Sequence, residues 1–155
     1  MLFVFDLDFT LWDAGGTWCD HTTAPYRKRN GHIIDGEGRR IVLYPDVRAI
    51  LESLQEKKIV MGLASRTHRP DTARKLLDMF GISNFFSFKQ LYPGSKIQHF
   101  QSLHQESGIP FSMMYFYDDE HRNIDEVSRL GVQARRVHAG LRWNDIKDQL
   151  PWEKY

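Results

Sequence analysis

Cysteine, net charge and long apolar runs are the features that this sequence has least of. Its 155 residues hold one cysteine, Cys19, which excludes an intramolecular disulfide and suits a reducing compartment. Lys and Arg number 21 against 20 Asp and Glu, so the net charge of +1 predicts no strong attraction to nucleic acid or to a membrane surface. No apolar run approaches the roughly 18 residues of a membrane span. These absences favour a cytoplasmic protein with no nucleic-acid or membrane partner.

The composition is that of an ordinary globular domain. Apolar residues make up 41% of the chain and charged residues 26%, and a chain of 155 residues can bury a core without disulfides or structural metals. No linker, internal repeat or low-complexity segment divides the sequence. We therefore expect a single domain over residues 1–155, present as a monomer or a weak dimer.

Short apolar runs alternate with helical periodicity along most of the chain. The first run, residues 2–5, is brief and has no basic leader, which is typical of a buried strand and not of a signal peptide. Further strands are predicted at 59–64, 85–88, 113–117 and 132–137. Helices are predicted after an N-cap at Asp46 and over residues 70–81, 97–108, 124–131 and 143–150. This alternation predicts a three-layer α/β/α sandwich with a mostly parallel sheet.

Residues 12–44 break the alternation. The segment is polar, contains five glycines and has two β-like pieces, at 33–34 and 40–43. Between these pieces, residues 35–38 have the composition of a hairpin turn. We interpret the segment as a small β-hairpin flap inserted after the first strand, and not as a separate domain.

Acidic side chains follow two of the predicted strands, at the sheet edge where α/β proteins bind ligands. Asp6 and Asp8 come directly after the first strand, and on an extended chain they face the same side, roughly 6–7 Å apart. Two carboxylates this close repel each other unless a cation or a proton accompanies them. Asp118 and Asp119 follow the strand at 113–117. Either pair alone could cap a turn or a helix, but together they form an oxygen-rich site without Cys or His, which suits Mg²⁺.

Three further residues bring hydrogen-bond donors and positive charge to the same edge. Ser65 and Arg66 follow the second strand, and Lys96 follows a helix-entry sequence at 93–95. A phosphoryl group needs donors and positive charge around its oxygens, and this set provides both. Each residue taken alone is more typical of a turn or of solvated surface, so the inference depends on their convergence.

Weaker features lie outside this set. None of the histidines has the spacing of a metal-ligand pair. Trp12 and Trp18 border the flap, where they are expected to pack or to line a substrate entrance. The basic run at 27–29 is interpreted as a solvated face, with contact to an anionic substrate as the alternative.

The residues assembled above resemble the motifs of the haloacid dehalogenase superfamily of phosphohydrolases. The run FDLDFTLW, residues 5–12, is similar to its first motif, and Ser65, Lys96 and the pair at 118–119 follow in the order of the other three. The similarity is closest to the magnesium-dependent phosphatase family, through the segments LYPDV, ASRT, LYPGSK and FYDDEHRN. It extends from residue 2 to about residue 140 and is weakest in the flap.

The resemblance implies a Mg²⁺-dependent phosphatase. Many members of the superfamily carry a large cap domain, but only about 30 residues separate the first strand from the next helix here, so no such cap is expected. Asp6 would be the nucleophile that forms an aspartyl-phosphate, and Asp8 would protonate the leaving oxygen and then activate water. Asp6, the backbone carbonyl of Asp8 and Asp119 would bind the metal, with Asp118 behind them. The residues implied to contact the substrate are Leu7, Ser65, Arg66 and Lys96, of which Ser65 and Lys96 are also counted as catalytic. The implied substrates are phosphate monoesters, either phosphotyrosine-like compounds or sugar phosphates.

Two other interpretations stay open. A phospho-accepting regulatory domain of the receiver type also places an Asp, a Ser or Thr, a Lys and an acidic pair around Mg²⁺. In that class the acidic pair follows the first strand, and the acceptor lacks the second acid that Asp8 provides here. A catalytically silent binding protein of the same fold is the other alternative, and the intact set of acidic and basic residues argues against it.

Overall fold

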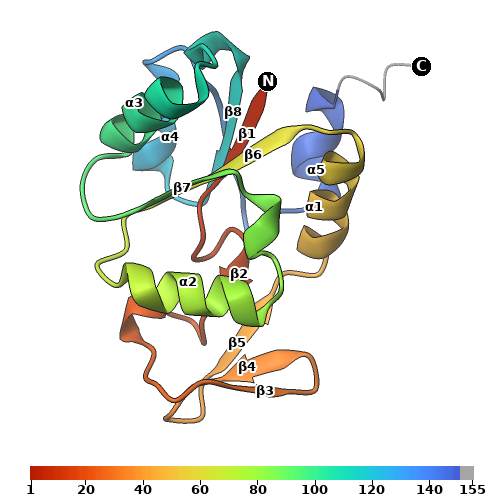
Figure 1. Cartoon of the computed structure of the whole chain (residues 1–155), viewed down its shortest axis with the longest axis vertical. Helices are drawn as coiled ribbons and strands as arrows, with labels where there is room; N and C mark the ends of the chain where they lie inside the picture. The colour runs from red at the N-terminus through yellow and green to blue at the C-terminus, as the bar shows by residue number, and fades with distance from the viewer. Residues whose placement is uncertain (151–155) are drawn as a thin grey trace.

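The computed structural model describes residues 1–150, and its centre is a parallel sheet of five strands in the order β7-β6-β1-β8-β9 (Figure 1). The strands are β1 (Leu2–Phe5), β6 (Val60–Ser65), β7 (Phe88–Leu91), β8 (Met114–Asp118) and β9 (Gln133–Arg136). All of β1 is buried between β6 and β8, which explains its uninterrupted apolar run. The last five residues of the predicted 1–155 domain lie outside the described residues.

Helices cover both faces of the sheet, which confirms the predicted three-layer sandwich (Figure 1). Side chains of β1 alternate between two hydrophobic cores. Phe3 and Phe5 pack in the first core with α1 (Val47–Glu56), α2 (Pro70–Met79) and α5 (Trp143–Ile146). Leu2 and Val4 pack in the second core with α3 (Lys96–Ser107) and α4 (His121–Ser128). No helix within residues 1–150 is both long and apolar enough to cross a membrane.

Two local predictions need correction. The third strand was predicted at 85–88, but β7 begins at Phe88, because Ser83–Phe85 forms a 3₁₀ turn and Phe86 packs in the first core. The prediction followed apolar residues alone and therefore placed the strand too early. β7 is an edge strand of the sheet, and it contains polar residues such as Gln90. Asp46 does precede α1, but its side chain makes no capping bond and instead accepts a hydrogen bond from the Trp143 backbone at 3.1 Å.

The flap is an antiparallel sheet of four strands in the order β2-β5-β4-β3, larger than the predicted hairpin. Its strands are β2 (Trp12–Asp13), β3 (Arg27–Arg29), β4 (His32–Ile34) and β5 (Arg40–Leu43). The predicted turn between β4 and β5 is confirmed, with buried Asp35 accepting the backbone N–H groups of Glu37 and Arg39 at 3.0 and 2.7 Å. The flap lies beside α2, and no larger cap is inserted anywhere in residues 1–150 (Figure 1).

Candidate active site

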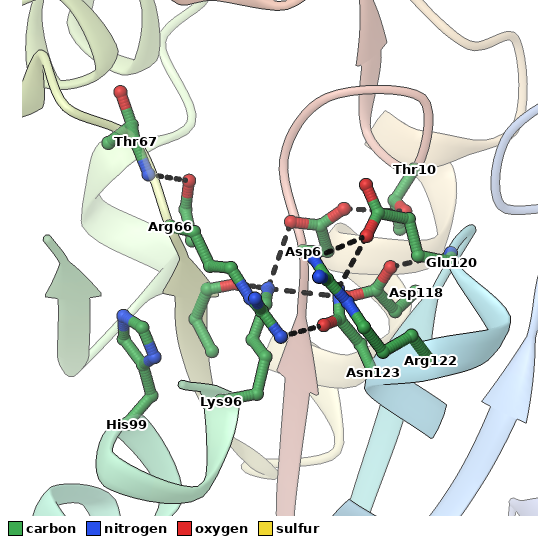
Figure 2. Close-up of polar contacts among 12 residues, drawn as sticks. Asp6, Thr10, Arg66, Thr67, Lys96, His99, Asp118, Glu120, Arg122 and Asn123 are labelled. Atoms are coloured by element: carbon green, nitrogen blue, oxygen red, sulfur yellow. Dashed lines mark hydrogen bonds and ion pairs between the residues drawn. The ribbon is translucent and has the colours of Figure 1, made fainter. Parts of the chain in front are cut away.

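The predicted site residues converge at the carboxyl edge of the central sheet, where Figure 2 shows Asp6, Lys96 and Asp118 directed toward one another. Asp6 follows β1 and is fixed to the neighbouring strand by its backbone N–H, which donates to the Tyr117 carbonyl at 3.0 Å. Ser65 ends β6, Asp118 ends β8, and Lys96 begins α3. A cavity of about 380 Å³ opens at this edge; of the predicted residues, those that line it are Asp6, Asp8, Ser65, Arg66, Lys96 and Asp119.

Lys96 is the buried cation at the centre of the site. Its side chain is 1% exposed, and Nζ lies 3.1 Å from Asp6 Oδ1 and 3.2 Å from Asp118 Oδ2. Nζ also donates to the carbonyl of Ala64. Burial lowers the pKa of Lys96, but the two carboxylates outweigh it and the net change is upward. Lys96 therefore stays charged. Its three oxygen partners compensate the ammonium for the hydration that it loses on burial.

Asp6, Asp118 and Asp119 bring carboxylate oxygens within 4.8 Å of one another. The pKa of Asp6 lies well above its ordinary value, because the group is buried and because Asp118 and Asp119 add negative charge that Lys96 offsets only in part. Three carboxylates against one ammonium leave an excess of negative charge in a buried place. An all-oxygen set of this kind fits a hard divalent cation such as Mg²⁺.

The two acids after β8 differ in their surroundings. Asp118 is fully buried, with Oδ1 accepting the Glu120 backbone N–H at 2.8 Å and Oδ2 accepting the Asn123 side-chain amide at 2.9 Å (Figure 2). Asp119 lines the cavity, whereas Asp118 does not. Burial raises the pKa of Asp119 to about 6, helped by the negative charge of Asp118 and opposed by a hydrogen bond with Asp6.

The two-residue spacing of Asp6 and Asp8 predicted an extended strand, but Asp8 lies in the turn after β1. The chain turns because the N–H groups of Thr10 and Leu11 bond back to the Leu7 carbonyl, and Phe9 adopts a positive φ of 63°. Asp8 Oδ1 accepts two hydrogen bonds of 2.8 Å, from the Trp12 indole and from the Cys19 backbone N–H. Burial outweighs both and raises the pKa of Asp8 to about 6. Near neutral pH such a carboxyl can both give and take a proton.

Three of the predicted substrate-binding residues differ in what they offer a ligand. Ser65 lines the cavity and accepts the Thr67 backbone N–H at 3.3 Å. Arg66 also lines it, but its guanidinium is turned toward α4, where it donates to Asn123 and pairs with Glu126 at 3.2 Å. The Leu7 side chain is fully buried in the first core, so only its backbone is available to a substrate.

Two residues of the site, Asn123 and Asp20, were not among the predicted site residues. Asn123 holds Asp118 and Arg66 together, and Asp20 binds the loop after β6. The two tryptophans have separate places: Trp12 is buried and bonds Asp8, whereas Trp18 is half exposed and lines the cavity. The basic run forms β3, whose three residues are exposed, as predicted. The contacts of Asp20 with the loop after β6 and of Asn123 with Arg66 join segments 47 to 57 residues apart, which neither spacing nor periodicity reveals.

The sequence model of the acid phosphatase family, described as "Acid Phosphatase", matches residues 1–154. The chain belongs to this family. Human "Magnesium-dependent phosphatase 1" is 42% identical over 151 residues, which cover 96% of this chain and 84% of that protein. A "HAD-like hydrolase superfamily protein" from Schizosaccharomyces pombe is 41% identical over 142 residues, covering 83% of this chain and 80% of that protein.

The chain also resembles solved structures at the level of the fold. The L-2-haloacid dehalogenase of Xanthobacter autotrophicus superimposes with a TM-score of 0.64 at 12% identity, over 88% of this chain and 76% of that one. At this identity the comparison shows a shared fold. The resemblance to the haloacid dehalogenase superfamily that the four motifs indicated is confirmed by the 41% identity to the fission yeast protein of that superfamily.

Proposed function

We propose that the chain is a Mg²⁺-dependent phosphatase that hydrolyses phosphate monoesters through an aspartyl-phosphate on Asp6. The observation that carries the proposal is the charge cluster at the sheet edge, where three carboxylates and one buried ammonium lie together and Asp6, Lys96 and Asp119 line a cavity. The name of the human relative supports the reaction class and the metal, and that of the fission yeast relative supports hydrolysis.

The residues present fit the metal, and each has a task in the reaction. Mg²⁺ held by Asp6, the Asp8 carbonyl and Asp119 would neutralise the negative charge of the phosphoryl oxygens. Asp119 is the better direct ligand because it faces the cavity. The oxygens of Asp118 already accept hydrogen bonds from Glu120 and Asn123 and pair with Lys96. Asp118 then serves to hold Lys96 in place.

The chemistry of hydrolysis divides between the two acids after β1. Asp6, held by Lys96, attacks phosphorus, and the bond from phosphorus to the ester oxygen breaks. Asp8, whose pKa of about 6 allows it to carry a proton, protonates the departing oxygen. The same carboxylate then removes a proton from water, which attacks the aspartyl-phosphate and releases inorganic phosphate. Ser65 donates its hydroxyl to a phosphoryl oxygen, beside the charge of Lys96.

The shape of the site supports a proposal for the substrate class. The four-stranded flap leaves the cavity open, with the half-exposed Trp18 at its edge. Phosphotyrosine-type compounds and sugar phosphates are the esters that we propose, because either can place a phosphoryl group at Asp6 while its leaving group extends outward past Trp18.

The test is Asp6→Asn in a phosphatase assay with Mg²⁺, against Asp71→Asn as a control on an exposed carboxylate of α2. We expect Asp6→Asn to lower kcat by at least about 10³-fold while the control keeps wild-type turnover. Asp8→Asn should accumulate the phosphoenzyme, visible as one added phosphoryl group by mass spectrometry. Full activity of Asp6→Asn, or of the wild type in EDTA, would contradict the proposal. A stable wild-type phosphoprotein without turnover would favour the receiver-like interpretation. A wild-type protein that hydrolyses none of the tested esters would favour the catalytically silent binding protein.

A further inference from the structure

One short 3₁₀ turn, η1 (Cys19–His21), connects the flap to two separate parts of the site. Asp20 in this turn contributes both of its carboxylate oxygens to the loop after β6. Oδ1 accepts the Thr67 hydroxyl, and Oδ2 accepts the His68 backbone N–H at 3.0 Å. The guanidinium of Arg69 returns the contact by donating to the Asp20 carbonyl at 3.2 Å. The two oxygens of the Asp20 carboxylate thus connect the turn to a loop 47 residues further along the chain.

The residue before Asp20 reaches the other side of the site. The Cys19 backbone N–H donates to Asp8 Oδ1 at 2.8 Å. On the loop side, Thr67 donates its backbone N–H to Ser65 Oγ at 3.3 Å (Figure 2). Consecutive residues of one turn therefore contact the proposed proton carrier, Asp8, and the loop that follows the proposed phosphoryl ligand, Ser65.

We propose that Asp20 is a positioning residue that fixes Asp8 relative to Ser65. The inference rests on the proposed function, because it takes the roles of Asp8 and Ser65 from there. It assigns no chemistry to Asp20 itself. Asp8 lies on the turn after β1 and Ser65 lies at the end of β6. The hydrogen bonds from Thr67 and His68 to Asp20, all three of which line the cavity, add a second connection between them. Catalysis requires the proton carrier and the phosphoryl donors to hold their geometry within a fraction of an ångström.

The test distinguishes a displaced Asp8 from a displaced Ser65 by comparing substrates with different leaving groups. Asp20→Ala removes the clamp, and kcat/KM is measured with p-nitrophenyl phosphate and with glycerol 3-phosphate. Both carry the same phosphoryl group, so displacement of Ser65 lowers both values equally. Only the alkyl ester has a poor leaving group that needs a proton from Asp8. We expect kcat/KM to fall about 10- to 100-fold for glycerol 3-phosphate and several-fold less for p-nitrophenyl phosphate.

Thr67 offers an independent route to the same clamp. Thr67→Val keeps the side-chain shape but loses the hydroxyl that Asp20 accepts, so it should repeat the selective loss even if Asp20→Ala folds poorly. Thr67→Ser keeps the hydroxyl and should retain wild-type selectivity between the two esters. Asp71→Ala removes an exposed carboxylate from the start of α2 and controls for the change in charge.

Defined outcomes overturn the inference without touching the proposed function. If the wild type is active and the Asp20→Ala and Thr67→Val enzymes lose the same factor on both esters, or lose nothing, Asp20 does not position Asp8. A lower melting temperature with unchanged kinetics would likewise assign Asp20 a purely structural role. If the wild type hydrolyses neither ester in Mg²⁺ and binds no inorganic phosphate, the proposed function fails, and this inference fails with it.

Discussion

Replacing Lys96 by Met tests the charge balance of the site most directly. The methionine keeps most of the volume of the buried stem but removes the ammonium, which lies 3.1 Å from Asp6 and 3.2 Å from Asp118. At an effective dielectric constant of about 20, each contact has a Coulomb energy of about 5 kcal/mol, part of which only offsets the desolvation of Lys96. Breaking a buried pair by removing one partner costs about 3–5 kcal/mol. We expect a loss of this size in the free energy of unfolding near pH 8.

The loss should depend on pH in one direction. The pKa of Asp6 in the folded protein already exceeds its ordinary value because of burial and the charge of Asp118, and removing Lys96 raises it further. A carboxyl with a raised folded pKa binds more protons in the folded than in the unfolded state, so stability decreases as pH rises through that interval. Lys96→Met should therefore be markedly less destabilised at pH 5 than at pH 8. Added Mg²⁺ should restore part of the stability at pH 8, since the cluster then holds an uncompensated negative charge.

Urea unfolding at the two pH values, with and without Mg²⁺, measures all of these effects. Lys75→Met is the matched control, because Lys75 is exposed on α2, and it should change the free energy of unfolding by less than about 0.5 kcal/mol. The reasoning is refuted if Lys96→Met is as stable as the control, or if its destabilisation is equal at pH 5 and pH 8.

Two further substitutions probe the elements around the site. Trp12→Phe removes a hydrogen bond that lowers the pKa of Asp8, so that pKa should move above about 6 and shift the basic limb of the kcat profile to higher pH; an unmoved profile would exclude this coupling. Gly140→Ala places a Cβ 2.1 Å from the Tyr44 ring at a φ of +86°, whereas Gly131→Ala at +98° meets no atom within 4 Å. Urea unfolding should show about 2–3 kcal/mol of destabilisation at Gly140 and about 1 kcal/mol at Gly131, and equal losses would contradict the clash.

Much of the fold could be read from local patterns. The run at 2–5 is apolar throughout because β1 is buried on both faces, and the helical stripes identified α1 to α4 because each helix faces the sheet on one side. The prediction failed where burial and strand formation separate. Phe85 is apolar but lies in a 3₁₀ turn, whereas polar Gln90 lies in β7 and donates to Glu106 at 2.8 Å.

The flap shows a different limit. Its central turn was predictable, because Asp35 and the glycines after it fix the backbone locally. The pairing of β2 with β5 was not, because the two strands lie about 30 residues apart and the two residues of β2 give no periodicity. The β3–β4 hairpin did have a local signal that the prediction did not use: Asn30 and Gly31 join the two strands with positive φ values of 52° and 79°, as a tight hairpin turn requires. The contacts of η1 with Asp8 and with the loop after β6 were not predictable either, because they join residues 11 and 47 positions apart that share no periodic pattern.

The sequence by itself determined the chemical inventory of the site: Asp6, Asp8, Ser65, Lys96 and the acidic pair 118–119 each follow a strand or begin a helix, and parallel topology brings those positions to one edge. Only the tertiary structure decided how these groups are charged and oriented. Burial sets the raised pKa values of Asp6 and Asp8, the cavity distinguishes Asp119 from Asp118, and hydrogen bonds across 47 residues make Asp20 part of the site. Those properties depend on distance and on exclusion of water, and both come into existence only when the chain is folded.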